Sequence, residues 1–398
     1  FAAGPMGQDP SDPDLAAVPD PASYTVVPWE PGLAVLQCDI HVDGEPWPYS
    51  PRVILKNQLA KLEARGLTAM AGFEAEYMLV DKDENGKLVI ADPLDTAQAP
   101  CYDVKALSRS LEFLKTTSRY MNQLGWENYA NDHEDANGQF EFDFNYSDAL
   151  TTCDRLTFFR MMAKHYAKEE GLVATMMPKP FADKTGTGAH FNMSLYDLKT
   201  GKNLFACDPK EDPRGIGLTP LGYQFVGGIL KHGRALCAAF APTVNSYKRL
   251  VRRGAMSYFS WAPVFNSYGS NNRTNSVRIP AGGGRCESRN ADGAVNPYLA
   301  ATLALAAGLE GIREGINPGA PNEDNLYELS DAQRRERGIE FLPQTLQEAV
   351  QAFADDPLVE RTLGKALRDE FVKYKTQEWE TYHLSVSEWE VARYSHMF

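Results

Sequence analysis

The sequence lacks the cysteine patterns that mark a metal finger or a disulfide framework. Its six cysteines are scattered over 398 residues, and no two of them have CxxC spacing. Free thiols in a reducing compartment are the favoured interpretation, and disulfides are the alternative. The sequence also lacks a long hydrophobic run. Its most apolar helical stretch, residues 298–309, is well short of the about 20 residues that cross a bilayer, so we expect a cytoplasmic protein without a membrane partner.

Positive charge is scarce in this chain. With 40 Lys and Arg against 53 Asp and Glu, its formal net charge is −13, which argues against nucleic acid or an anionic membrane as the main partner. Such a protein must concentrate its cations locally if it binds anionic ligands. No secretory leader is visible from Phe1 onward, and the opening residues read like an internal loop, so we expect further chain upstream.

No internal repeat is evident, and the predicted elements alternate without a fixed period. Residues 1–23 are rich in Pro, Asp and Gly and read as a linker or covering loop. Strands are predicted at residues 33–42, 72–80, 126–132, 139–146, 188–195, 274–280 and 285–289, and a DENG turn at 83–86 predicts a hairpin. Helices are predicted at residues 51–65, 104–124, 150–170, 219–240, 293–312, 344–354 and 357–376. This pattern indicates an α+β fold with one sheet-based domain and helices packed outside.

Several predicted strands have a polar face and an apolar face on opposite sides. In GFEAEYMLV (72–80), Glu74 and Glu76 are two positions apart, so both carboxylates point to the same side. The same parity groups Gln139, Glu141, Asp143 and Asn145 on a second strand, His190, Asn192 and Ser194 on a third, and Arg285, Glu287 and Arg289 on a fourth. These faces either meet water or, if the strands are neighbours, line one cavity.

A shared cavity would crowd several carboxylates together. Two unit charges 4 Å apart repel by about 4 kcal/mol at an effective dielectric constant near 20, so such carboxylates would protonate or move apart unless cations lay among them. Carboxylate oxygens with one imidazole suit Mg²⁺ or Mn²⁺ and not a thiolate-seeking Zn²⁺. The strands therefore predict a site for divalent ions.

An ordered set of motifs resembles the glutamine synthetase superfamily from about residue 14 to the end. The set is FEAEY, HEDANGQFE, MPKPF, GTGAHFNMS, APTVNSYKRL, NNRTNSVRIP, RCESRNADGAVNPYLA and NLYEL. The resemblance implies a catalytic domain over residues 24–398, in which a curved antiparallel sheet forms an active-site funnel with helices outside. It also implies that residues 1–23 are the end of a small N-terminal β-grasp-like domain.

The resemblance implies two or three Mg²⁺ or Mn²⁺ ions per site, with ATP as co-substrate. Glu76, Glu134 and Glu141 match the ligands of the ion that touches the amino-acid substrate. Glu74, His190 and Glu287 match those of the ion that touches the nucleotide phosphates. Taken without the other motifs, His190 is also typical of a core histidine whose ring nitrogens are hydrogen-bonded.

The remaining site residues also follow from the resemblance. The implied glutamate site contains Arg249, Arg289, Thr185 and Gly186, with Gly188 in the same loop, and the implied nucleotide site contains Ser194, Asn192, Arg278, Arg285 and Tyr146. Arg273, Arg249 and Trp261 are the candidate catalytic residues. Arg273 and Arg278 would neutralise phosphate charge, because a planar guanidinium suits carboxylate and phosphate. Each arginine alone is also typical of a surface ion pair.

The implied reaction is a two-step ligation. The glutamate side-chain carboxylate attacks the ATP γ-phosphate to give γ-glutamyl phosphate and ADP, and an amine then displaces phosphate to form the amide. A non-catalytic scaffold is the remote alternative. The resemblance also implies a homo-oligomer of stacked rings, a dodecamer, with sites shared between neighbours. Tyr327 stands where some relatives are adenylylated, and we expect an ordinary packed tyrosine there.

This sequence departs from the family pattern around the amine. Trp261 replaces the flap glutamate, Asn192 replaces a second histidine, and Thr185 replaces an asparagine. The aspartate loop that binds ammonium should lie before Phe1. An indole in place of a carboxylate favours methylamine, since a cation–π contact contributes roughly 0.5–2 kcal/mol. The WAP and NNRT segments also resemble the subgroup that includes γ-glutamylmethylamide synthetase. Ammonia, with Trp261 only packing the flap, is the alternative.

Overall fold

The N-terminal part of the chain is ordered into small sheets. The computed structural model describes residues 12–252 and 260–398. In it, β1 (Ala16–Pro19) pairs antiparallel with β4 (Cys38–Val42), which continues into β5 (Glu45–Pro46). The expected irregular segment up to residue 23 is therefore wrong for residues 16–19, because the non-proline residues Ala16, Ala17 and Val18 keep the N–H groups that a strand pair needs. The strand predicted at residues 33–42 is divided into β3 (Ala34–Val35) and β4, and β3 pairs with β2 (Thr25–Val26).

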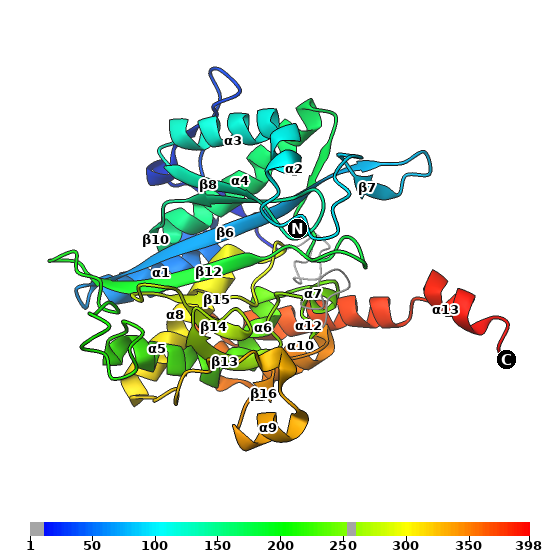
Figure 1. Cartoon of the computed structure of the whole chain (residues 1–398). Coiled ribbons are helices and arrows are strands. Elements are labelled where there is room, and N and C mark those ends of the chain that lie inside the picture. The colour runs from blue at the N-terminus through cyan, green and yellow to red at the C-terminus, as the bar shows by residue number, and fades with distance from the viewer. Residues whose placement is uncertain (1–11, 253–259) are drawn as a thin grey trace.

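One large sheet forms the centre of the molecule (Figure 1). Its strand order is β16-β13-β14-β15-β12-β6-β9-β8, with β7, β10 and β11 also paired to β6. The strands are β6 (Leu67–Lys82), β7 (Leu88–Ile90), β8 (Asn128–His133), β9 (Gln139–Phe144), β10 (Ser147–Asp148), β11 (Val173–Thr175), β12 (Ala189–Asp197), β13 (Phe265–Ser270), β14 (Asn275–Ile279), β15 (Cys286–Ser288) and β16 (Glu340–Phe341). The sheet is mixed, because β13 and β14 run parallel. The prediction of an antiparallel sheet is wrong for that pair, since alternation along a strand does not encode the direction of its neighbour.

Helices cover one side of the sheet. The helices are α1 (Pro51–Glu63), α2 (Val104–Arg109), α3 (Leu111–Gln123), α4 (Ala149–Glu169), α5 (Pro220–Lys231), α6 (Gly233–Phe240), α7 (Ser246–Arg249), α8 (Pro297–Glu314), α9 (Asp331–Glu336), α10 (Leu346–Asp355), α11 (Pro357–Leu363), α12 (Lys365–His383) and α13 (Glu388–Tyr394). Three predicted helices are broken in two, at Ser110, His232 and Gly364. Gly364 has φ +80°, which a continuous helix cannot contain. No helix in the described residues combines the length and apolar character needed to cross a bilayer.

The aromatic faces of the strands form the core. Phe142 of β9 stacks with Tyr77 of β6, and both rings contact Phe159 of α4. Phe73 of β6 likewise contacts Phe191 of β12. Since these rings occupy the helix-covered face, the alternate side chains of the same strands are directed to the opposite face, as the parity of the sequence predicts.

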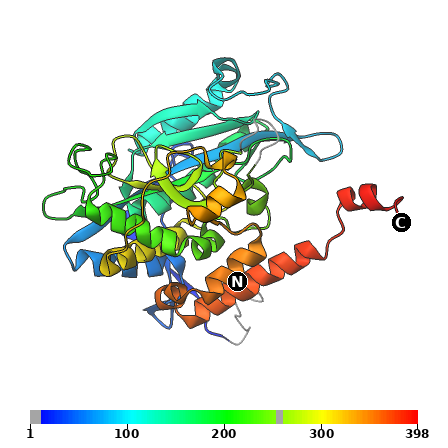
Figure 2. The ribbon, with the colours of Figure 1, turned by 60° about the horizontal axis from the view of Figure 1, so that its bottom comes forward.

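The C-terminal helices extend away from this body. Figure 1 and Figure 2 show α12 running outward and α13 standing apart from the sheet. Several large apolar side chains of this end are exposed: Leu384, Val386, Trp389, Val391, Tyr394, Met397 and Phe398. We call residues 384–398 the C-terminal arm.

Candidate active site

Strand register brings the acidic side chains of different strands together. His190 on β12 lies directly opposite Glu74 on β6, and Glu76 lies opposite Glu141 on β9. Glu287 on β15 is opposite Asn192, which is two positions beyond His190. Because i and i+2 side chains share a face, this register places the predicted carboxylates on one side of three neighbouring strand pairs.

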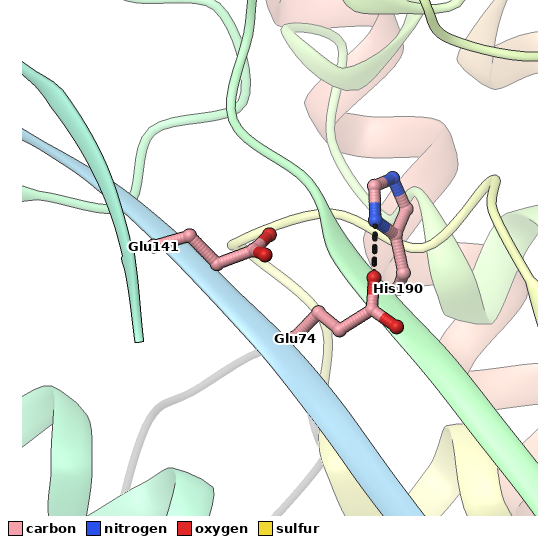
Figure 3. A group of neighbouring side chains, drawn as sticks. All are labelled: Glu74, Glu141 and His190. Carbon is pink, nitrogen blue, oxygen red and sulfur yellow. Dashed lines mark hydrogen bonds and ion pairs between the residues drawn. The ribbon is translucent and has the colours of Figure 1, made fainter. Parts of the chain in front are cut away.

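His190 lies at the centre of the acidic cluster. Its Nδ1 atom is 3.1 Å from Oε2 of Glu74, 3.8 Å from Oε1 of Glu76 and 3.9 Å from Oε1 of Glu287. Figure 3 shows the Glu74–His190 contact, with Glu141 reaching in from the neighbouring strand. Ligand-type atoms of Glu74, Glu141 and His190 all lie within 4.8 Å of one another.

Burial makes it energetically unfavourable for the carboxyl groups of this cluster to be ionised together. Burial raises the pKa of Glu134 to about 8, with repulsion from Glu76 adding to the effect. Burial also raises the pKa of Glu141 well above its ordinary value, and it raises that of Glu76 even though Arg249 opposes the shift. The pKa of His190 is held well below its ordinary value by burial, so its imidazole is neutral. Clustered carboxylates and a neutral imidazole are a donor set that suits a hard divalent cation.

Arginines border the cluster and supply opposite charge. Glu287 accepts hydrogen bonds from Nη1 of Arg278, at 2.7 Å, and from Nη1 of Arg289. Arg249 is 4 % exposed, and its Nη1 atom has no hydrogen-bond partner among the described residues. Burial accordingly lowers the pKa of Arg249. Arg249 lines a cavity, and a buried guanidinium nitrogen without a partner is a candidate donor to a ligand carboxylate.

Two adjoining cavities contain the predicted residues. The acidic cavity, of about 520 Å³, is lined by Glu74, Glu76, Glu134, Glu141, Thr185, Gly186, His190, Arg249, Trp261, Arg273, Arg278, Arg285 and Arg289. The second, of about 400 Å³, is lined by Tyr146, Asn192, Ser194, Gly283 and Gly284 among others. Glu74 and Arg285 line both cavities. The geometry therefore brings the predicted glutamate, metal and nucleotide residues into one continuous region, with Glu287 buried directly behind it.

Asn192 connects the two cavities. Its Nδ2 donates to Oε1 of Glu74 at 2.9 Å, and its Oδ1 accepts from Nε of Arg285 at 3.0 Å. On the far wall of the second cavity, the hydroxyl of Tyr146 is 3.2 Å from that of Tyr196. The contacts of Asn192 therefore fix the orientation of Glu74 from the side of the second cavity.

The glycine loop before β12 is packed too tightly for a side chain. A Cβ atom at Gly188 would lie 2.7 Å from Oε1 of Glu76 and 2.9 Å from Nη2 of Arg249. The backbone N–H of Gly188 itself donates to Oε2 of Glu76 at 2.7 Å. At Gly186, an added Cβ would be 2.3 Å from the carbonyl oxygen of Pro178. The loop therefore holds backbone directly against the acidic cluster.

Trp261 stands at the mouth of the acidic cavity. Its side chain is 44 % exposed, and its φ of +55° is unusual for a bulky residue. Its carbonyl oxygen accepts from Nη2 of Arg289 at 3.3 Å. Tyr327, by contrast, is buried, and its hydroxyl donates to the carbonyl oxygen of Ala262 at 2.7 Å, as expected for a packed tyrosine.

Some cavity residues were not predicted as site residues. They include Cys101, Tyr102, Tyr129, Asp132, Asp135 and Asp143. Asp132 lies opposite Glu141 in the register of β8 and β9, which period-two analysis of residues 128–133 would have indicated. Tyr102 follows an irregular segment and has φ +61°, a feature that no sequence pattern encodes.

Comparison with known proteins identifies relatives of this arrangement. Residues 48–394 match the family described as glutamine synthetase, catalytic domain. A glutamate–methylamine ligase of Methyloversatilis universalis is 46 % identical over 399 residues, covering 100 % of this chain and 88 % of the relative. A glutamine synthetase of Rhizobium meliloti is 40 % identical over 385 residues, covering 96 % and 85 % respectively.

Solved structures show the same likeness. A structure titled as a GmaS/ADP complex aligns with a TM-score of 0.90 at 41 % identity, covering 99 % of this chain and 88 % of that one. A ligand-free GmaS structure aligns with a TM-score of 0.87 at 40 % identity, with the same coverage.

Proposed function

Because the chain belongs to the glutamine synthetase family and is an ATP-dependent carbon–nitrogen ligase, we propose that it joins L-glutamate to methylamine. The products would be the γ-glutamyl amide, ADP and phosphate, with γ-glutamyl phosphate as the intermediate. The observation that carries this proposal is the convergence of Glu74, Glu76 and Glu287 within 4 Å of one His190 nitrogen, bordered by arginines. Glutamine synthesis from ammonia is the second candidate.

The acidic cluster fits bound divalent ions. Glu76, Glu134 and Glu141 would hold one ion, and Glu74, His190 and Glu287 the other. Bound there, Mg²⁺ or Mn²⁺ would neutralise phosphate charge and align the transferring phosphoryl group. Support comes from the raised pKa values of Glu134 and Glu141, because such buried carboxylates ionise together only beside a strong positive charge. A scaffold without chemistry would bear this electrostatic cost for no gain.

The arginines of the chain would position both substrates. Arg249, with its buried unpartnered Nη1, and Arg289 would hold the α-carboxylate of glutamate, leaving the γ-carboxylate near the cluster. Arg273 and Arg278 would face the phosphates, while Ser194, Tyr146 and Arg285 line the second cavity, where the nucleotide would bind. Positioning and charge neutralisation of this kind supply most of the acceleration in phosphoryl transfer.

Trp261 favours methylamine as the acceptor. Its indole occupies the mouth of the acidic cavity, where it can contact an alkyl group or attract an alkylammonium by a cation–π interaction. The relative at 46 % identity is named for the same amine. Other curated relatives, at 36–41 % identity, include glutamine synthetases, which keeps ammonia as the alternative.

The direct test is phosphate release from ATP with glutamate, Mg²⁺ and one amine at a time. Initial rates would be compared for methylamine, ammonium, ethylamine and isopropylamine, with a reaction lacking amine as the control. We expect the highest kcat/KM with methylamine. Faster turnover with ammonium would instead assign the chain as a glutamine synthetase, and no release with any amine would reject the ligase.

We further propose that the chain assembles into a homo-oligomer of stacked rings. The C-terminal arm supports this, because side chains such as Leu384 (80 % exposed), Trp389 (65 %) and Phe398 (99 %) leave an apolar surface that a single chain does not cover. A second copy of the chain is the partner that such an arm would fit in a symmetric assembly.

A further inference from the structure

A part-buried pair in the acidic cavity, Thr185 and Asp135, is not among the predicted metal ligands. The hydroxyl of Thr185 donates to Oδ2 of Asp135 at 2.7 Å. Asp135 is 7 % exposed, and both residues line the acidic cavity. Thr185 is also one of the positions at which this chain departs from the family pattern.

Asp135 and Thr185 belong to two loops that are tied together by side-chain hydrogen bonds. Besides the Thr185–Asp135 bond, Nζ of Lys184 donates to Oδ1 of Asn137 at 2.8 Å. Nε2 of Gln139 donates to the carbonyl oxygen of Gly186 at 3.1 Å. With two bonds between the loops and a third from the first residue of β9, the Asp135 carboxylate has a fixed place in the cavity wall.

The same dipeptide that contacts Asp135 also contacts Arg249. The backbone of Gly186 lies so close to the Arg249 stem that an added Cβ would be 3.0 Å from its Cγ. A cationic side chain and an anionic one therefore both lie against residues 185–186 and line the acidic cavity. Nη1 of Arg249 has no hydrogen-bond partner among the described residues, and the Asp135 carboxylate is held by the Thr185 hydroxyl.

This pairing of charges matches the α-carbon of an amino acid. In L-glutamate, the α-carboxylate and the α-ammonium are attached to one carbon, so a site that holds the carboxylate also fixes the place of the ammonium. An ammonium group has three donors and no acceptor, and a carboxylate can accept several hydrogen bonds at once. We propose that Asp135, oriented by Thr185, accepts a hydrogen bond from the substrate α-ammonium and makes that group a requirement for binding. The inference rests on the proposed function.

The consequence is discrimination against glutarate, which has both carboxylates of glutamate but no α-ammonium. With glutarate bound, the buried Asp135 carboxylate would lose the hydrogen bond that the substrate α-ammonium donates. A site that hydrogen-bonds a polar group of its substrate strongly rejects an analogue without that group. The wild-type enzyme should therefore show far higher kcat/KM for glutamate than for glutarate.

The test measures kcat and KM for glutamate and glutarate, at saturating ATP, Mg²⁺ and methylamine, for the wild type and Asp135→Asn. We expect the variant to raise KM for glutamate about 10- to 100-fold, the range of a charge-assisted hydrogen bond, with little change in kcat. Its kcat/KM for glutarate should stay the same or rise, so the glutamate-to-glutarate ratio falls at least about tenfold.

Further variants separate recognition from structure. Thr185→Val should also lower the ratio of kcat/KM for glutamate to kcat/KM for glutarate. Thr185→Ser keeps the hydroxyl and should largely preserve this ratio. Asp183→Asn is the matched charge control, because Asp183 is exposed and outside the wall of the acidic cavity. A ratio unchanged in Asp135→Asn would overturn the proposal, as would a wild type that accepts glutarate as well as glutamate. A wild type inactive with every amine would instead reject the proposed function itself.

Discussion

At the scale of single residues, the acidic cluster is held together against its own repulsion. Glu141 and Glu76 are buried and lie opposite each other in the sheet. Without cations, each buried charge adds to the free energy of the folded state, since desolvation and repulsion both disfavour it. The residues proposed to bind the ions are therefore also residues that destabilise the metal-free protein.

Glu141→Gln tests this opposition. The change removes a buried acid and keeps its shape, so the metal-free variant should be more stable than the wild type by about 1 kcal/mol. It should also lose most of the stabilisation that Mg²⁺ gives, and its activity should fall roughly 100-fold or more. Thermal melts in EDTA and in MgCl₂ measure both effects. Glu84→Gln, in the exposed β6–β7 turn, is the control, and a Glu141→Gln variant stabilised by Mg²⁺ like the wild type would contradict the ligand assignment.

Trp261→Glu tests the residue proposed to select the amine. A carboxylate at the cavity mouth attracts ammonium and removes the apolar contact with a methyl group. The ratio of kcat/KM for methylamine to that for ammonium should fall on the order of tenfold. Trp261→Phe keeps an aromatic face and should change this ratio less. Equal ratios in all three proteins would show that Trp261 only packs the flap.

The strand residues of the candidate site could be grouped by parity, whereas Glu134, Arg249 and Trp261 were expected only from the resemblance to the family. Glu74 and Glu76, or His190 and Asn192, are two positions apart, and the strands that carry them keep this alternation in the structure. The contributions of Asp135 and Tyr102 could not be predicted in this way. Both are in irregular segments, where side-chain direction depends on local φ and ψ and on contacts distant in sequence.

At the scale of elements, a buried carboxylate joins three helices. Glu310 of α8 is 4 % exposed and accepts from Nζ of Lys231 and Nε2 of His232, at the junction of α5 and α6. It is also paired with Arg361 of α11. Burial alone would raise its pKa, but the hydrogen bonds from Lys231 and His232 outweigh burial and lower the pKa to about 2.

Glu310→Gln should therefore destabilise the protein in a pH-dependent way. The folded pKa lies below the ordinary value of 4.5, so the ionised carboxylate stabilises the fold above that pH, and the contribution is lost as pH falls toward 2. We expect the free energy of unfolding to be lower in the variant by roughly 2–3 kcal/mol at pH 7, and the difference to be smaller at pH 3. Urea unfolding at both pH values measures it. Glu314→Gln is the control, since Glu314 binds the same Lys231 from an exposed position, and a loss independent of pH would contradict the assignment.

The positions of the helices and the longer strands were predicted better than the breaks within helices and the pairing of strands. Helices with a clear start, such as α1 after Ser50 and α4 after Asp148, match the prediction closely. The break at His232 was missed because residues 219–240 keep an apolar pattern across it, and the break depends on tertiary packing. The strands β11 and β16 were missed because two or three residues are too few to show a period.

At the scale of the whole molecule, the C-terminal arm stands apart from the sheet, and none of its residues is buried. Removal of residues 385–398 should leave the sheet and both cavities intact, because none of these residues is buried. It should reduce the size of the assembly measured by light scattering. Substitution of Glu388 by Gln, which leaves the apolar surface in place, serves as the control. A truncated chain that assembles like the full one would show that the arm is not an interface.

The arm also has an optical consequence. Trp389 is one of six tryptophans and is 65 % exposed. The wavelength of indole emission depends on the polarity around the ring. The difference in fluorescence between the wild type and Trp389→Phe would therefore follow subunit association on dilution, without any attached dye.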